Sequence, residues 1–230
     1  SKTLEITTLE FPPYVYNEKG VIKGFNVDLL NEIFKRMNIS VNIKIYPWAR
    51  AMKMVREGRA DAIFPALKNE ERMEFLYFPD GFVTEPIVMF VKKDSSIQYN
   101  GELQKMNSYM FGRVRGFSSG PVFDRLLNEG VLKCEDVSSY EINLKKCLAN
   151  RINIAIENKF VALYYLSILD KNGELVELKP ELVVLPSYLA FSKKRANKDL
   201  VKKYNKVWHQ MKKDGSFQKI IENFFEKFKN

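Results

Sequence analysis

The stretch GRADAIFPALKNEER, residues 58–72, carries three structural signals in succession. Residues 48–57, which precede it, have apolar side chains at helical spacing, and the opening glycine is the residue that most easily takes the left-handed conformation that ends a helix. Residues 60–64 are apolar and predict a buried strand that we expect to stop at Pro65. Asn69 then has the chemistry of an N-cap, with two glutamates in the first turn of the helix that follows.

The loop between that strand and that helix is a candidate binding site. Open α/β sheets bind ligands at the carboxyl ends of their strands, where backbone N–H groups and helix dipoles converge. Arg72 lies one turn into the helix, and its guanidinium can hold a carboxylate through two parallel hydrogen bonds. From this segment alone, Arg72 is equally well explained as the partner of a neighbouring glutamate on the helix surface.

The residues before this stretch alternate between strand and helix patterns. We predict strands at 4–8 and 41–46, and a helix at 24–38 with apolar side chains along one face. Residues 10–16 contain two prolines and three aromatic residues, which predicts a stiff turn rather than a central strand. The order strand, helix, strand, helix, strand is typical of a parallel α/β sheet with right-handed crossovers.

A second α/β unit is predicted to begin after a polar stretch at residues 92–100. We expect its strands near 109–114, 135–138 and 152–156, and its helices near 122–128 and 143–149. The helix stop and strand around Gly58 recur around Asn150, 92 residues later (150 − 58 = 92). This recurrence predicts that both halves contain the same unit of helix, strand and loop.

The end of the chain is predicted to return to the first unit. Residues 182–185 and 188–191 have strand patterns on either side of Pro186, and residues 199–228 form two amphipathic helix patterns broken around Gly215. We therefore expect an α/β fold with two lobes joined by two hinge segments. The expected lobes are residues 1–91 with 188–230, and residues 92–187.

Composition limits the classes of function. The chain has 230 residues, of which 46% are hydrophobic, enough for packed cores. No apolar run approaches the ~20 residues that a membrane-spanning helix needs. The formal charge of +9 comes from 37 basic and 28 acidic residues. The basic residues are interspersed with acids rather than gathered with aromatic residues, which favours a solvated basic surface over a nucleic-acid site.

Cysteine and histidine are too few for several kinds of site. With Cys134, Cys147 and His209 as the only such residues, structural zinc sites and Cys–His catalysis are poorly supported, and we expect neither metal nor cofactor. The two cysteines either form one disulfide in an exported protein or remain free and buried. The chain opens at Ser1 without a charged-then-apolar leader, so it is expected to be cytosolic or to have lost a secretion signal.

Six segments, taken together and in order, resemble the extracellular solute-binding proteins of family 3, the periplasmic receptors of polar amino-acid ABC transporters. The segments are FPPYVYNEKGVIKGFNVDLLNEI, REGRADAIFPALKNEERMEFLYFPDGF, RVRGFSSGPVF, NRINIAIENKFVALYYL, LPSYLAFSKK and KKDGSFQKIIENFF. The resemblance covers essentially the whole chain and points to a divergent branch. It implies a type II periplasmic-binding fold, a periplasmic monomer without its signal peptide, a membrane permease as partner and no catalytic residues.

The resemblance also implies ligand-binding residues. The aromatic residue after the proline of the first loop stacks on the ligand in the family, and here it is Tyr14. The arginine of the family's threonine-x-x-arginine motif holds the ligand carboxylate, and here it is Arg72, with Asn69 in place of the threonine. The family's glycine–threonine turn resembles the turn after Arg115, where the hydroxyl comes from Ser118 or Ser119.

The chain departs from the family at the anchor for the ligand ammonium. Family members that bind α-amino acids have an aspartate where this chain has Asn158, so an ammonium group would have to be held by the preceding Glu157 or by Glu10, or not at all. Further cations are available in Arg50, which lies beside Trp48, and in Arg115 and Lys68. They predict a small anionic or zwitterionic solute with one or more carboxylates.

Two alternatives remain open at this stage. One is an enzyme on the same fold that resembles the cyclohexadienyl dehydratases, with Glu157 as general acid. The sequence shows no base–nucleophile pair, so a binding protein is favoured. The other alternative is the ligand-sensing domain of a membrane receptor.

Overall fold

The chain forms two compact α/β units in the computed structural model, which describes residues 3–117 and 119–227. Unit 1 contains the residues up to Thr84 and those from Pro186 onward, and unit 2 contains Glu85–Leu185. The first crossing was expected after residue 91 and the second after residue 187. The first comes earlier because Ile87 to Phe90 of strand β7 (Val83–Lys92) pair with strand β10 (Ile154–Asn158) of unit 2.

The sheet of unit 1 is built around three parallel strands. β1 (Leu4–Thr8) lies between β4 (Val41–Ile45) and β5 (Ala62–Ala66) and is parallel to both. The end of β11 (Leu175–Ser192) pairs antiparallel with β5 and with β6 (Leu76–Tyr77). The predicted parallel sheet is thus confirmed for three strands, and an antiparallel fourth strand extends it.

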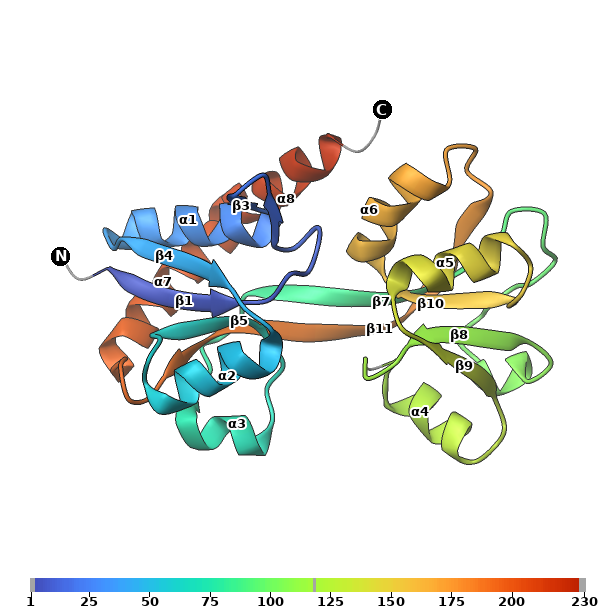
Figure 1. The fold of residues 1–230 in the computed structure, drawn as a ribbon, viewed down its shortest axis with the longest axis horizontal. Coiled ribbons are helices and arrows are strands. Elements are labelled where there is room, and N and C mark those ends of the chain that lie inside the picture. Colours follow the sequence, from blue (N-terminus) through green and yellow to red (C-terminus); the bar gives the residue numbers. More distant parts are fainter. Residues whose placement is uncertain (1–2, 118, 228–230) are drawn as a thin grey trace. The chain divides into compact units, whose positions relative to one another are not determined.

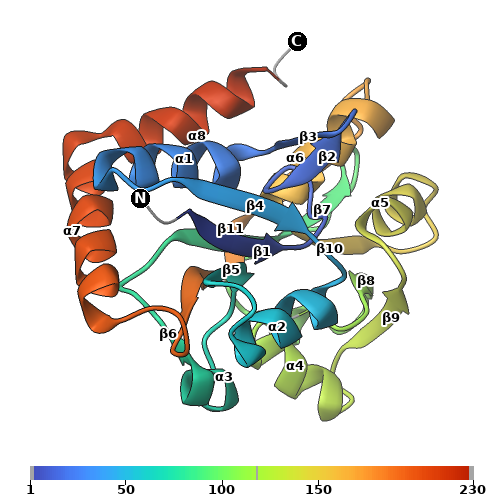
Figure 2. The ribbon, with the colours of Figure 1, turned by 60° about the vertical axis from the view of Figure 1, so that its left-hand side comes forward.

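Helices cover both sides of this sheet. Figures 1 and 2 show α1 (Phe25–Met37) and α8 (Ser216–Glu226) on one side, and α2 (Trp48–Glu57) and α3 (Glu70–Phe75) on the other. α7 (Lys198–Asp214) packs against α1 and α8. The predicted break between the last two helices is confirmed at Gly215, which has a φ of 80°. The expected end of the last helix, residue 228, lies outside the described residues. A small hairpin of β2 (Tyr16–Glu18) and β3 (Val21–Lys23) completes the unit.

Unit 2 repeats the arrangement. β8 (Met110–Val114) lies between β9 (Lys133–Val137) and β10 and is parallel to both, and β7 pairs antiparallel with β10. Figure 1 shows α5 (Tyr140–Leu148) and α6 (Lys159–Leu169) on one side of these strands and α4 (Pro121–Asn128) on the other. A short 3-10 helix, η1 (Leu103–Met106), packs beside α4. α6 was not predicted.

The internal repeat is longer than the sequence match indicated. Strand β4, helix α2 and strand β5 begin 92 residues before β9, α5 and β10 respectively (133 − 41, 140 − 48 and 154 − 62). The stop residues Gly58 and Asn150 both have positive φ, 75° and 56°. Asp61 Oδ2 and Asn153 Oδ1 each accept a hydrogen bond of 2.8 Å from the backbone N–H of a neighbouring strand. The two units therefore close the same structural motif in the same way.

Two expectations about prolines were wrong. β5 continues through Pro65 to Ala66, because the pairing of β11 with β5 shifts register between Tyr188 and Ala190 and does not require an N–H from the proline. β11 likewise runs through Pro186 as one strand, because its pairing with β5 begins only at Tyr188.

The cysteines are free thiols. Cys134 on β9 is partly buried and Cys147 on α5 is fully buried. Burial raises the pKa of Cys134 to about 12 and that of Cys147 to about 11. Both thiols are therefore protonated near neutral pH. No helix within residues 3–117 and 119–227 combines the length and apolar character needed to cross a bilayer.

Candidate functional site

The carboxyl ends of β1, β4 and β5 lie at one edge of unit 1, because the three strands are parallel. Tyr46 and Pro47 connect β4 to α2, and residues 67–69 connect β5 to α3. Five predicted site residues lie on these connections or in the first turns that follow: Trp48, Arg50, Lys68, Asn69 and Arg72. The fold thus brings them to the edge where open α/β sheets bind ligands.

Arg72 is held in place by the loop that precedes it. Its Nη1 donates a 2.7 Å hydrogen bond to the Leu67 carbonyl, and its Cζ lies 5.8 Å from the centre of the Trp48 ring. Its backbone N–H donates to Asn69 Oδ1 at 2.8 Å. The side chain is half-buried, and this burial lowers the pKa of Arg72, although nearby Glu71 raises it. The guanidinium is therefore partly desolvated and fixed by its neighbours.

The alternative of a surface ion pair for Arg72 does not match the structure. Glu71 pairs with Arg56, whose guanidinium also lies 4.3 Å from the centre of the Phe75 ring. Within the described part of the chain, no carboxylate lies at ion-pair distance from Arg72. Its charge is therefore available to a ligand.

Arg50 lies over an aromatic ring in a similar way. It is exposed, and its Cζ is 4.9 Å from the centre of the Tyr46 ring. Tyr46 and Trp48 are both partly buried against the same apolar cluster, which includes Ala51. Tyr46 was not among the predicted site residues. The signal that could have found it is an aromatic residue at the strand end, just before an arginine in the next helical turn.

Asn69 and Lys68 have different roles in this loop. Asn69 is the N-cap of α3, as predicted, and its side-chain oxygen is used for that purpose. Asn69 therefore positions Arg72 through the backbone. Lys68 is exposed next to it.

The expected role of Tyr14 needs correction. Its ring has no exposed surface, stacks on Phe11 with ring centres 4.8 Å apart, and lies 4.6 Å from the Phe25 ring. A ligand cannot stack on a ring that is covered in this way. Tyr14 is a core residue that fixes the first loop, and we leave it out of the proposed site.

In unit 2, three of the predicted site residues follow β8 in the sequence. Arg115 is exposed, Ser119 is buried, and Ser118 lies outside the described residues. Phe117 is 47% exposed, and its ring centre lies 5.2 Å from that of Tyr140 at the start of α5. Tyr140 corresponds to Trp48 in the 92-residue repeat, which is a signal that the sequence analysis missed.

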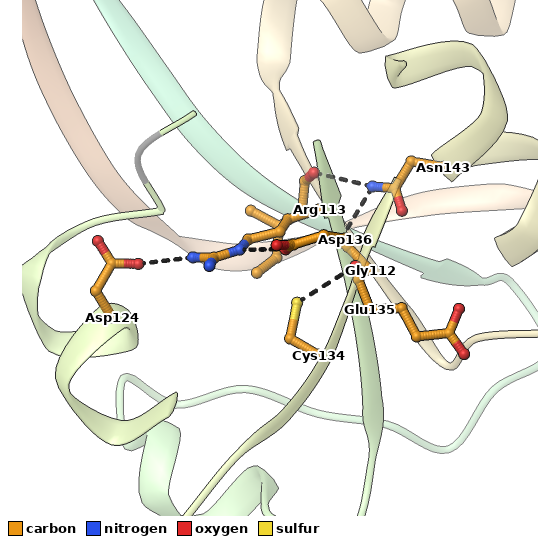
Figure 3. A network of polar contacts seen from close by, with 8 residues as sticks. Gly112, Arg113, Asp124, Cys134, Glu135, Asp136 and Asn143 are labelled. Carbon is orange, nitrogen blue, oxygen red and sulfur yellow. Dashed lines mark hydrogen bonds and ion pairs between the residues drawn. The ribbon is translucent and has the colours of Figure 1, made fainter. Parts of the chain in front are cut away.

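A polar network fixes the strand that leads into this turn (Figure 3). The guanidinium of Arg113 donates to Asp136 at 2.9 Å and to Asp124 at 2.8 Å, which links β8 to β9 and to α4. Arg113 is therefore satisfied inside its own unit. Arg115, two positions later, has no carboxylate at ion-pair distance among the residues that the structure describes.

Glu157 is buried, which does not favour it as an anchor for a ligand ammonium group. It is buried on the side of β10 that faces α5, where Asn143 Nδ2 donates to its Oε1 at 2.9 Å. Burial raises the pKa of Glu157 well above its ordinary value, although the Asn143 hydrogen bond lowers it. Among the described residues, its Oε2 has no hydrogen-bond partner. Burial therefore favours the protonated, uncharged form of Glu157.

The other candidate for an ammonium anchor is Glu10, and Asn158 is the uncharged residue at the position of the family's aspartate. Asn158 is buried at the N-cap of α6, where its Oδ1 accepts hydrogen bonds from Phe160 and Val161. Glu10 is exposed, and its carboxylate accepts from the backbone N–H of Asn17. The structure thus separates the neighbours Glu157 and Asn158, which place their side chains in different surroundings.

Two α/β units with the same strand order, between which the chain crosses twice, define the fold of the type II periplasmic binding proteins. A solved substrate-binding domain from Streptococcus pneumoniae, described as part of an amino-acid ABC transporter, is 20% identical with a TM-score of 0.77 and covers 96% of this chain and 99% of that chain. An ancestral arginine-binding protein bound to arginine is 24% identical with a TM-score of 0.72, covering 97% and 98% of the two chains.

Sequence comparison identifies the protein family within this fold class. The L-cystine-binding protein TcyA of Bacillus subtilis is 23% identical over 218 residues, which are 94% of this chain and 78% of that protein. The family described as bacterial extracellular solute-binding proteins, family 3, matches residues 5–227. The chain belongs to this family.

Proposed function

We propose that this chain captures a small carboxylate-bearing solute, an amino acid or a related compound, and delivers it to the membrane permease of an ABC transporter. The main observation in support is the environment of Arg72. Its partly buried guanidinium lies over Trp48 and has no carboxylate partner among the described residues. Membership of the solute-binding family supports it. The names of relatives such as TcyA support an amino-acid-like solute.

In the proposed mechanism, unit 1 binds the solute first. The free donors of the Arg72 guanidinium bind its carboxylate, with Trp48 beside them. The two crossing strands, β7 and β11, are the proposed hinges that take the chain to a closed form when the solute binds. Binding shifts the population toward the closed form only as far as the solute prefers it.

The proposed role is that of a receptor rather than an enzyme. The dehydratase alternative needs Glu157 to donate a proton to a bound substrate. Glu157 instead is buried and accepts a hydrogen bond from Asn143 of α5. This burial does not favour a catalytic role. We further propose that the receptor works outside the cytoplasmic membrane, which the word extracellular in the family description supports, and that it works as a monomer.

A thermal-shift screen tests the proposal. Purified protein is heated with amino acids, dicarboxylates and related solutes at millimolar concentration. A true ligand at about 100 times its Kd stabilises the folded protein by roughly 2.7 kcal/mol, which raises the melting temperature by several degrees. The absence of a shift with every solute would contradict the proposal.

A further inference from the structure

We infer that the solute carries two anionic groups, one bound by Arg72 and the other by Arg50. This inference rests on the proposed function and specifies the class of solute. The groups are two carboxylates, or one carboxylate and one phosphate, because a guanidinium fork fits both.

The ion pairs of unit 1, whose arginines all lie in the described residues, divide these arginines into two groups. Four of them have a carboxylate partner inside the unit: Arg36 with Glu32 and Asp214, Arg56 with Glu71, Arg59 with Glu57, and Arg195 with Asp61. Arg50 and Arg72 have none at ion-pair distance among the described residues. Both lie at the strand-end edge where a ligand is expected.

The two guanidinium groups are held in similar ways. Each lies over an aromatic ring, Arg50 over Tyr46 at 4.9 Å and Arg72 over Trp48 at 5.8 Å. Contact with a ring face leaves the in-plane N–H donors available and restricts the side chain. Arg72 spends one donor on the Leu67 carbonyl, so its remaining donors suit one anionic group. The guanidinium of Arg50 is then the matching partner for a second anionic group.

The two rings belong to one short segment. Tyr46 and Trp48 are separated by one residue and pack against the same apolar cluster. The two arginines therefore lie over two aromatic rings that pack close together at one edge of the sheet. Lys68, exposed on the adjoining loop, adds positive charge there.

The balance of acidic and basic groups also bears on the charge of the solute. Glu71 is paired with Arg56, and Glu10 and Glu70 are exposed in the first loop and in the first turn of α3. Against them stand three cations, Arg50, Lys68 and Arg72, of which the two arginines have no carboxylate partner among the described residues. The excess of positive charge favours a solute with two negative groups.

The test compares solutes of similar shape that differ by one charge. L-glutamate is paired with L-glutamine, and glutarate with its monoamide, while 3-phosphoglycerate represents the carboxylate–phosphate class. Affinities for wild-type protein, Arg50→Ala, Arg72→Ala and Arg59→Ala are measured by calorimetry. Arg59 is the matched control because it is an exposed, ion-paired arginine of the same unit.

We expect wild-type protein to bind the member of a pair with two anionic groups at least tenfold more tightly. Arg50→Ala should reduce that preference by at least tenfold, whereas Arg59→Ala should retain it. Arg72→Ala should weaken both members of the pair. Preference for the phosphate compound over the dicarboxylates would identify which anions the two forks accept.

Other outcomes separate this inference from the proposed function. Tight binding of a solute with one anionic group, through Arg72 and with no effect of Arg50→Ala, would overturn the inference and leave the receptor function intact. Failure of every solute in the panel to bind would count against both.

Discussion

Glu157 carries a buried carboxyl group, and its surroundings influence its protonation. Asn143 Nδ2 donates to it and also to the carbonyls of Gly112 and Ile156, so one amide serves three acceptors. Removal from water disfavours the charged carboxylate more than this shared hydrogen bond favours it. Folding therefore requires Glu157 to keep its proton at pH values where the unfolded chain has lost it.

The first prediction concerns the stability of Glu157→Gln as a function of pH. Since the pKa of Glu157 is raised in the folded protein, its contribution to stability is full below the ordinary glutamate pKa and is lost as pH rises toward the folded-state pKa. In that window this group lowers the free energy of unfolding by about 1.4 kcal/mol per pH unit. The variant should lose this slope in urea unfolding at pH 4.5, 6 and 8. Glu129→Gln, an exposed control, should keep it; parallel curves for wild type and Glu157→Gln would contradict the prediction.

The second prediction concerns Arg72→Ala. The change removes the guanidinium group that the Leu67 carbonyl and Trp48 hold in place. The carboxylate of a bound solute is then removed from water without a charged hydrogen-bond partner. We expect binding to weaken by on the order of 2–5 kcal/mol. Calorimetry with a solute that stabilises the wild type measures this loss, and Arg59→Ala is the control. Unchanged affinity would remove Arg72 from the site.

The third prediction concerns Asn158→Asp. Aspartate is as good an N-cap as asparagine, and α6 has no acidic residue in its first turn, so the variant should fold. The variant places a carboxylate at the position where the family has its ammonium-binding aspartate. We therefore expect it to bind neutral α-amino acids roughly tenfold more tightly. Equal affinity of the two proteins in calorimetry would mean that another group, such as Glu10, already holds the ammonium.

At the scale of elements, α3 is the least supported part of the site. It has six residues, none of them buried, and its N-terminus depends on Asn69. The sequence contained this cap and the strand before it, which is why the position of Arg72 could be predicted. Tyr14 could not be placed, because a proline-rich loop does not show which of its aromatic residues packs inward. α6 was missed because KFVALYYLSIL is apolar on all sides and has no helical periodicity.

The fourth prediction concerns Asn69→Ala. Loss of the cap should destabilise α3 locally by about 0.5–2 kcal/mol and weaken solute binding, because Arg72 loses its backbone support. Hydrogen exchange should increase in residues 70–75 while the melting temperature changes little. Asn69→Asp retains the cap and should behave like the wild type. Unaltered exchange in Asn69→Ala would show that other contacts hold α3.

At the scale of the whole molecule, the chain crosses between its units twice, in β7 and in β11. The repeat around Gly58 and Asn150 and the terminal helix pair were sufficient to predict two α/β units. The crossings lie at other residues than the sequence predicted, after Thr84 and after Leu185. Each falls inside a strand that belongs to both units, β7 or β11, and a hydrophobic pattern does not show where such a strand changes its pairing partner. Arg113 and Arg115 show the same limit of sequence-based prediction. Arg113 is ion-paired and Arg115 is not, as far as the described residues go, and the difference depends on Asp124 and Asp136, which are distant in the sequence.

The fifth prediction follows from movement about these two strands. Small-angle X-ray scattering should show a smaller radius of gyration when a solute that stabilises the protein is added at saturation. Arg72→Ala at the same solute concentration should keep the value of the unliganded protein. Identical scattering of wild type with and without solute would argue against closure as the binding response.

The sheet of unit 1 receives its fourth strand only near the end of the chain. β5 pairs with residues 188–191 of β11, and α1 packs against α7 and α8, whereas unit 2 is one continuous segment. During synthesis on a ribosome, all the strands and helices of unit 2 are made before the last strand and helices of unit 1. We therefore expect nascent unit 1 to keep an uncovered strand edge until β11 is made, and chaperones that hold unfinished chains to bind at that edge.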